Sequence, residues 1–224
     1  MKILKFALVA VISSFLMVIS SNAVEKRIGI AAGFTSINAE GTETQKDTST
    51  KSDSEAGANA IIPSIFLELA ADNGFGLGIE HVPGSADINS KTRSSALNHP
   101  GDGNDTGTNK ASAEIDGLTS IYLIKTFESG FFVKAGQTST TVNTKEVLAS
   151  GSVYKNADVD GLVLGLGMNR TTDSGFFYRV SGEYTDYDSI SLTSQTADAS
   201  TGKFNKISAD VDTVAFKLSI GKAF

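Results

Sequence analysis

The 224-residue sequence contains no cysteine and no tryptophan, and it has only two histidines and three prolines. Without cysteine the chain can form no disulfide, no thiolate metal site and no cysteine nucleophile. Acidic residues outnumber lysine and arginine by 25 to 19, and the formal net charge is −6. This balance argues against nucleic acid as a partner, because phosphate contacts need clustered basic residues. These absences argue against most metal and catalytic chemistry.

The first 23 residues have the layout of a secretory signal peptide. Two lysines within residues 1–5 precede an apolar stretch over residues 6–19, and small or polar residues follow up to Ala23. A membrane-spanning helix needs about 20 apolar residues, so this stretch is too short to be one. We expect cleavage after Ala23 and a mature chain of residues 24–224, in which no later stretch is apolar enough for a spanning helix.

Apolar and polar residues alternate along most of the mature chain, and helical periodicity is nearly absent. The last segment is the clearest example, because Val214, Phe216, Leu218 and Ile220 share one face and small or polar residues share the other. From Val214 to Phe224 such a strand rises about 23 Å when tilted by ~45°, close to the ~25 Å apolar band of a transmembrane barrel. The pattern predicts an all-β chain.

A short motif recurs three times between the alternating segments. Residues 71–76, 127–132 and 173–178 each contain polar residues, then a glycine, then one or more aromatic residues. A polar residue followed by glycine is typical of a tight hairpin turn, and aromatic residues gather where strands enter a membrane interface. Three such turns predict eight strands, which we place at residues 27–37, 60–70, 75–83, 112–127, 131–139, 158–170, 176–187 and 209–224.

The connections at the opposite ends of these strands are long and polar. They cover residues 38–59, 83–111, 140–157 and 188–208 and are rich in Ser, Thr, Asn, Asp and Gly. Such a composition cannot build an apolar core, so we expect four long extracellular loops. Short turns on one side and long loops on the other predict an eight-stranded antiparallel up-and-down transmembrane β-barrel, in which Pro63 lies near the loop end of its strand.

Six charged side chains fall on the polar faces of the predicted strands: Glu68, Glu80, Lys134, Arg179, Glu183 and Lys217. Their distances from the nearest turn, or from the last residue, place them in one layer. A charge on the lipid face costs about 2–4 kcal/mol near the middle of the membrane, so we expect all six to face the lumen. An eight-stranded barrel has little room inside, and the charges must pair. We expect an ion-pair network that closes the lumen, with a gated narrow conductance as the alternative.

The predicted strand at residues 112–127 allows two registers. In the first, Glu114 and Asp116 face the lumen, Ile115 faces lipid, and Lys125 extends to the interface. In the second, Lys125 itself faces the lumen. We prefer the first register.

The whole mature chain resembles the eight-stranded outer-membrane barrels of Gram-negative bacteria, of the OmpA and OmpX type. The resemblance is carried by the signal peptide, the alternating strands, the turns and the terminal aromatic residue. In that family a C-terminal aromatic residue after alternating apolar positions is read by the machinery that inserts barrels. The matching residues are Phe216, Leu218, Ile220 and Phe224. Lys222 departs from the signal. The resemblance implies an integral protein of the bacterial outer membrane, in contact with its lipid and lipopolysaccharide.

No residue pattern predicts catalysis, a cofactor or a metal site. A hydrolase at His81 would need a serine and a carboxylate beside it, and the nearest, Ser85 and Asp87, fall in a predicted loop. A sequence like the start of a calcium loop begins at Asp102, but its twelfth position is Ala113, where a glutamate is needed.

We therefore expect a barrel that is not an enzyme and binds no cofactor. Its expected role is structural or in surface interaction, with extracellular partners at the loops. Two alternatives are a small passive pore and, from a different class, a soluble lipocalin-like barrel that binds an apolar ligand. The lipocalin-like barrel would need an apolar interior and a polar exterior.

Overall fold

The computed structural model describes residues 24–44, 51–96, 106–145, 153–197 and 202–224. The predicted signal peptide and Asp102 of the calcium-like sequence lie outside these ranges. Within them, no helix is long and apolar enough to cross a membrane.

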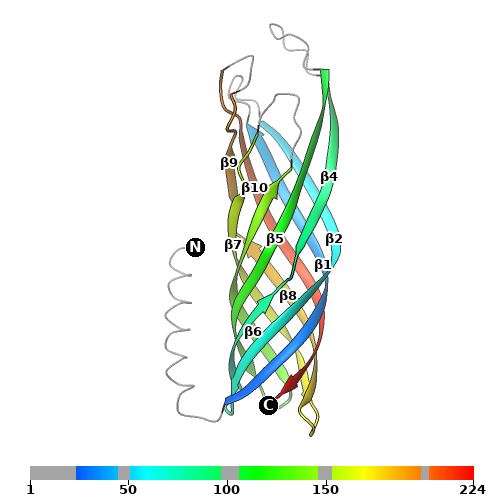
Figure 1. Cartoon of the computed structure of the whole chain (residues 1–224), viewed down its shortest axis with the longest axis vertical. Helices are drawn as coiled ribbons and strands as arrows, with labels where there is room; N and C mark the ends of the chain where they lie inside the picture. The colour runs from blue at the N-terminus through cyan, green and yellow to red at the C-terminus, as the bar shows by residue number, and fades with distance from the viewer. Residues whose placement is uncertain (1–23, 45–50, 97–105, 146–152, 198–201) are drawn as a thin grey trace.

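Ten antiparallel strands form one sheet that closes on itself (Figure 1). The first five are β1 (Val24–Thr44), β2 (Lys51–Ala71), β3 (Phe75–His81), β4 (Ser85–Ala96) and β5 (Thr106–Thr126). The others are β6 (Phe131–Thr144), β7 (Ala157–Thr171), β8 (Phe176–Tyr187), β9 (Ile190–Thr193) and β10 (Lys206–Ala223). Pairing of β1 with β10 closes the sheet. β4 continues β3 along β5, and β9 only adds to the far end of β10, so the barrel wall has eight strand positions. We call each of these positions a stave. The predicted eight-stranded antiparallel barrel is confirmed.

The three short turns gather at one end of the barrel, which we call the turn end. Gly74, Gly130 and Gly175 have φ angles of 80°, 84° and 81°, as the hairpin chemistry requires. Each glycine N–H donates a 2.8 Å hydrogen bond to the carbonyl three residues earlier. The recurring motif therefore forms three turns of the same construction, as predicted.

The outer surface near the turn end carries large exposed apolar side chains on all eight staves. We call this surface the apolar belt and define it by Ile30, Leu67, Ile79, Ile121, Val133, Leu166, Val180 and Leu218. Their neighbours along each strand point inward, which is the two-faced alternation that the sequence predicts.

Lumen-facing glycines make room for aromatic rings inside the same part of the barrel. The pairs are Gly29 with Phe66, Gly78 with Tyr122, Gly167 with Phe132, and Gly221 with Phe177. A Cβ added to any of these glycines would lie 2.3–2.8 Å from a ring atom of its partner. Large and small residues thus alternate around the wall and fill the lumen above the turns.

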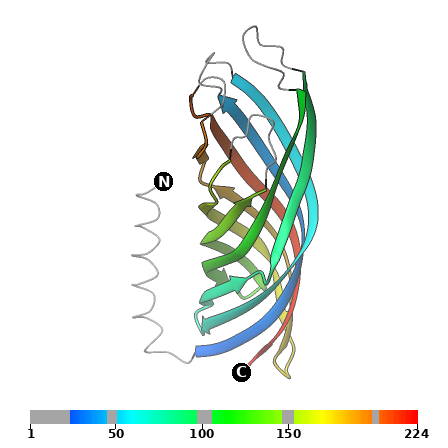
Figure 2. The same ribbon diagram turned by 45° about the horizontal axis from the view of Figure 1, so that its top comes forward.

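The strands continue well beyond the predicted boundaries at the other end, the loop end. Residues 38–44 of β1 and 51–59 of β2, predicted as loop, form a continuous ladder that ends at Thr44 opposite Lys51. β4, the start of β5 and the end of β6 likewise lie in predicted connections. Backbone hydrogen bonds hold these ladders without an apolar core, and Ser and Thr are compatible with strands. Figures 1 and 2 show β4 and β5 rising side by side as a two-stranded ribbon.

The preferred register of β5 is confirmed near the turn end, where Lys125 lies on the outer face beside Phe75. Toward the loop end, a β-bulge in β5 shifts this register. Asp116 pairs with Thr141 and Thr119 with Ser139, so β5 has one residue more than β6 between these pairs.

Gly117, with φ of 65°, lies in this bulge. The shift turns Glu114 and Asp116 to the outer face and Ile115 to the inner face, because Ile115 pairs with the inward-facing position Val142. The prediction that Glu114 and Asp116 face the lumen is wrong. A period-2 pattern cannot reveal the extra residue of a bulge.

Two opposed prolines end the ladder between β2 and β3. The last paired residues are Ile65 and His81. Two positions farther along, where the next pair of ladder hydrogen bonds would form, Pro63 faces Pro83. The N–H of Val82 donates to Leu118 on β5, so the backbone nitrogen of the next residue, Pro83, faces β2. Neither proline has an N–H to donate. Above them, in the described ranges, β2 pairs only with β1 and β4 only with β5. We call this interruption of the wall the seam.

Candidate functional site

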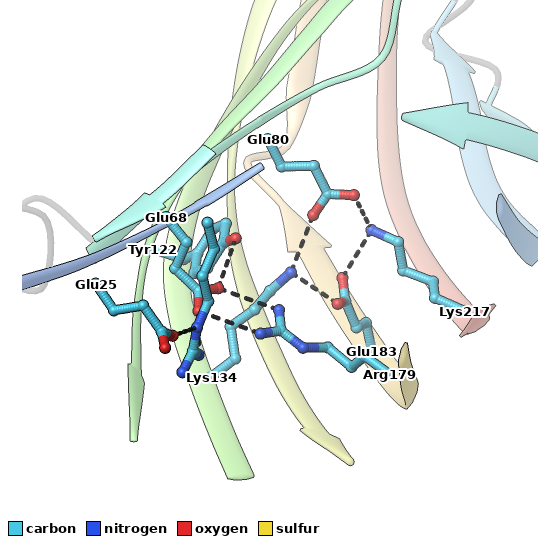
Figure 3. Close-up of polar contacts among 9 residues, drawn as sticks. Glu25, Glu68, Glu80, Tyr122, Lys134, Arg179, Glu183 and Lys217 are labelled. Atoms are coloured by element: carbon cyan, nitrogen blue, oxygen red, sulfur yellow. Dashed lines mark hydrogen bonds and ion pairs between the residues drawn. The ribbon is translucent and has the colours of Figure 1, made fainter. Parts of the chain in front are cut away.

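Four charged side chains from four different staves form a closed ring of ion pairs across the lumen (Figure 3). Lys134 Nζ on β6 lies 3.1 Å from Glu80 Oε2 on β3 and 2.7 Å from Glu183 Oε1 on β8. Lys217 Nζ on β10 pairs with Glu80 and lies 3.2 Å from Glu183 Oε2. Ser64 Oγ donates a 2.6 Å hydrogen bond to Glu80. We call these two acids and two lysines the four-charge ring. Their formal charges sum to zero.

A second cluster surrounds the carboxylate of Glu68, whose side chain is 0% exposed. Arg27 Nη1 donates to Glu68 Oε1 at 3.0 Å, and Arg179 donates through Nη1 and Nη2 at 3.1 and 3.2 Å. The hydroxyl of Tyr122 donates to Glu68 Oε2 at 3.3 Å. Arg27 also pairs with Glu25. We call these five residues the Glu68 cluster. Its two carboxylates and two guanidinium groups also cancel.

Three aromatic rings lie close to the Arg179 guanidinium. The ring centroids of Phe132, Phe66 and Phe177 lie 4.9, 5.6 and 5.7 Å from its central carbon. Cation–π contact partly replaces the water that the buried cation has lost. Lys134 Nζ lies 4.4 Å from the ring centroid of Tyr122, so the four-charge ring and the Glu68 cluster are in contact.

A cavity of about 740 Å³ lies beneath these charges at the turn end. Glu25 and Arg27 line it together with Thr126 and Phe127, and no member of the four-charge ring does. The open space at this mouth therefore reaches the Glu68 cluster and not the ring.

The structure brings all six predicted lumen charges to the inside of the barrel. Glu68 and Arg179 join one cluster, while Glu80, Lys134, Glu183 and Lys217 form the other, so the predicted single layer is two contacting groups. Glu25 and Arg27 belong to the Glu68 cluster but were not among the predicted lumen charges. A signal was present, because Arg27 is in phase with the small inward-facing residues that follow it on β1.

The residues of the predicted insertion signal lie on the outer face of the last stave. Phe216, Leu218, Ile220 and Phe224 are 54–74% exposed. Their recognition by the insertion machinery stays a prediction. Lys222, the departure from the signal, donates to the carbonyl of Ser174 in the third turn.

His81 has a structural hydrogen bond on the outer face of β3. Its Nδ1 lies 2.9 Å from Thr119 Oγ1 on the neighbouring stave. Ser85 begins β4 beyond the seam, and the side chain of Asp87 lies outside the description. In the described part of the chain, no group of three or more His, Cys, Asp or Glu side chains is arranged to hold a metal ion.

Comparison with known proteins finds similarity in structure alone. No protein-family model matches the sequence, and no curated protein does. The crystal structure of the outer-membrane protein OprG from Pseudomonas aeruginosa superposes with a TM-score of 0.58 at 13% identity, over 91% of this chain and 97% of OprG. The solid-state NMR structure of the outer-membrane protein AlkL in lipid bilayers gives 0.55 at 10% identity, over 91% of each chain. The chain thus has the fold of the eight-stranded outer-membrane barrels.

Proposed function

We propose that this chain, which shares its fold with the barrels OprG and AlkL, is an integral protein of the bacterial outer membrane. The apolar belt supports this location, because exposed apolar side chains on every stave suit hydrocarbon and not water. A soluble ligand-binding barrel would need the opposite arrangement. Here the charges are inside and the apolar side chains are outside.

We further propose that the barrel is not an enzyme and is closed to passage along its full length. The four-charge ring carries this proposal. Its side chains come from β3, β6, β8 and β10 and bond to one another across the lumen, and each lysine contacts both carboxylates. Breaking such a pair leaves an uncompensated buried charge, which costs about 3–5 kcal/mol. A ring of this kind resists opening by thermal motion.

A role at the cell surface is supported by a row of like charges at the loop end. Glu40 on β1 lies directly opposite Glu55 on β2 and Asp210 on β10. Like charges in directly opposed positions destabilise a sheet. Selection for stability alone does not explain three carboxylates in a row across three neighbouring strands. Recognition of a cationic partner does.

Single-channel recording tests the closed lumen. Mature protein that shows a heat-modifiable gel shift, and is therefore folded, should give no unitary conductance steps in a planar bilayer. A variant with all four ring residues changed to alanine keeps the net charge, and conduction by this variant would assign the closure to the ring and not to the aromatic side chains and the Glu68 cluster beside it. Steps from the folded wild type would overturn the proposal. A folded ring-deleted variant that stays silent would show that the closure lies elsewhere.

The seam favours a second function, the lateral exchange of small apolar molecules with the outer leaflet. Directly above the four-charge ring the lumen is lined by uncharged side chains: Thr35, Ile37, Ile62, Thr138, Val163, Thr185 and Ala215. Ile61, on the outer face beside the seam, is 74% exposed. An apolar molecule that enters from the loop end would meet the charged ring below it and the interrupted wall beside it.

A seam-closing variant tests this second function. Pro63→Val combined with Pro83→Val restores two N–H donors at facing positions and should extend the ladder between β2 and the stave of β3 and β4. Wild-type barrels in vesicles should speed the uptake of a fluorescent naphthylamine probe, and the double variant should slow it. Equal uptake by the two folded proteins would rule out the seam as the route.

A further inference from the structure

Each of the three turns is bound by a cation from the first stave after its hairpin. Lys125 on β5 donates to Asn73 O, Arg170 on β7 donates to Ser129 O at 2.8 Å, and Lys222 on β10 donates to Ser174 O. All three cations lie on the outer face, at the lower edge of the apolar belt. The same arrangement thus recurs around the barrel, once for each turn.

Exposed aromatic rings accompany the two lysines. Lys125 Nζ lies 4.4 Å from the ring centroid of Phe75, and Lys222 Nζ lies 4.5 Å from that of Phe176. Each ring belongs to the residue directly opposite its lysine on the neighbouring strand. The rings are 42% and 60% exposed, so the ammonium groups lie at the boundary between the belt and the turns.

Among the residues that the structure describes, these three cations have no counterion, unlike those of the lumen. In the part of the chain that the structure describes, no carboxylate lies within ion-pair distance of them, although each turn has one exposed acid, Asp72, Glu128 or Asp173. A lysine has three N–H donors and an arginine five, and each turn carbonyl takes one. Each site therefore keeps a positive charge and spare donors beside an apolar surface.

We propose that Lys125, Arg170 and Lys222 form three sites for the phosphate of anionic phospholipids in the periplasmic leaflet, an inference that rests on the membrane location proposed above. The phosphate supplies the missing countercharge and accepts the spare N–H donors. The acyl chains lie against the belt directly above. Because each cation is fixed by its turn carbonyl, the donors are held in place before the lipid arrives.

Lipid retention in native mass spectrometry tests these sites. The mature protein in non-ionic detergent should retain up to three molecules of phosphatidylglycerol and fewer of phosphatidylcholine at the same concentration. The triple variant Lys125→Gln, Arg170→Gln, Lys222→Gln should lose this preference. A charge-matched control, Lys155→Gln, Lys203→Gln, Lys206→Gln, changes the loop end and should keep it. Glycerophosphoglycerol, the headgroup without chains, should not compete at equal concentration.

Rescue separates a lipid site from a structural role in the turns. Lys125→Arg, Arg170→Lys, Lys222→Arg keeps all three charges and should restore the preference for phosphatidylglycerol. If the triple glutamine variant lacks a heat-modifiable band, the three single variants, each expected to lose one of three lipids, replace it. Equal retention of the two lipids by a folded wild type, or full retention by the folded glutamine variants, would overturn the sites. A wild type that conducts would overturn the closed lumen and leave this result unaffected.

Discussion

The two halves of the barrel are built from the same antiparallel ladder but obey different constraints. The turn half carries the apolar belt, the four-charge ring and the Glu68 cluster. Each residue there faces either the apolar surroundings outside the wall or the narrow lumen inside it. In the loop half, well above the seam, the ladder becomes polar on both faces, as the run from Asn38 to Thr44 shows. In the turn half, whether a residue faces inward or outward therefore determines whether it is polar or apolar. In the loop half this constraint is weak.

The difference shows where the stability of the molecule resides. Glu68 is 0% exposed and contacts two guanidinium groups, whereas the ion pair between Lys145 and Glu114 has side chains that are 48% and 19% exposed. Buried pairs are costly to break and exposed pairs contribute little. Equivalent substitutions in the two halves should thus differ greatly in their effect.

The largest expected effect is that of Glu68→Ala. The substitution leaves Arg27 and Arg179 without their shared carboxylate and should lower the free energy of unfolding by about 3–5 kcal/mol. Urea titration of the folded, heat-modifiable band in lipid vesicles measures it. Glu40→Ala in the loop half removes a like charge and should leave the midpoint unchanged or raise it. Equal losses for the two variants would mean that burial does not separate the halves.

A charge placed on the outer face should have the next largest effect. Leu166 is 58% exposed on the belt, and Leu166→Arg should cost about 2–4 kcal/mol if it lies near the middle of the membrane. Asp186→Arg, on the outer face of the same hairpin in the loop half, should be nearly neutral because it meets water. The same urea titration compares them, and tolerance of Leu166→Arg would argue against a lipid-facing belt.

A turn glycine should matter more than a loop glycine of similar backbone conformation. At Gly74, with φ of 80°, an added Cβ would lie 2.1 Å from the carbonyl oxygen of Thr126. Gly74→Ala should cost about 1–3 kcal/mol. Gly202 has φ of 66° but no atom within 4 Å of an added Cβ, so Gly202→Ala should cost only about 1 kcal/mol of backbone strain. Similar midpoints for the two variants would show that close packing at the turn is unimportant.

The smallest effect concerns Glu114, above the bulge in β5. The hydrogen bond from Lys145 holds the pKa of its carboxyl below the usual range. Because the folded pKa is lowered, the pair stabilises the ladder above the ordinary carboxyl pKa and stops doing so as pH falls through the folded value. Carboxyl NMR titration should show Lys145→Gln raising the pKa of Glu114 while the gel shift stays unchanged. An unchanged titration would contradict the pairing.

The contrast between the halves also explains which features of the barrel could be predicted from the sequence. In the turn half, lipid on one side and a narrow lumen on the other force strict alternation, so the parity of Glu80 and Lys217 was enough to place them inside. Parity could not say which charges would touch. The division into two clusters depends on stagger between strands, which no periodicity shows.

The loop half was harder to predict because polar residues on both faces look like loop. The ladder over residues 38–44 and 51–59 carries no apolar face, so alternation gave no signal there. The inverted positions of Glu114 and Asp116 follow from the bulge at Gly117. A single inserted residue turns every side chain beyond it to the other face, and the pattern on either side remains regular.

Cysteine labelling tests the central claim, that the turn half lies in the membrane and the loop half in water. The chain has no cysteine of its own, so single substitutions report without background. Leu166→Cys on the belt and Asp186→Cys on the same hairpin can be compared in lipid vesicles with a membrane-impermeant maleimide. We expect rapid labelling at position 186 and protection at position 166 until the barrel is unfolded. Equally rapid labelling at both positions in the folded protein would contradict it.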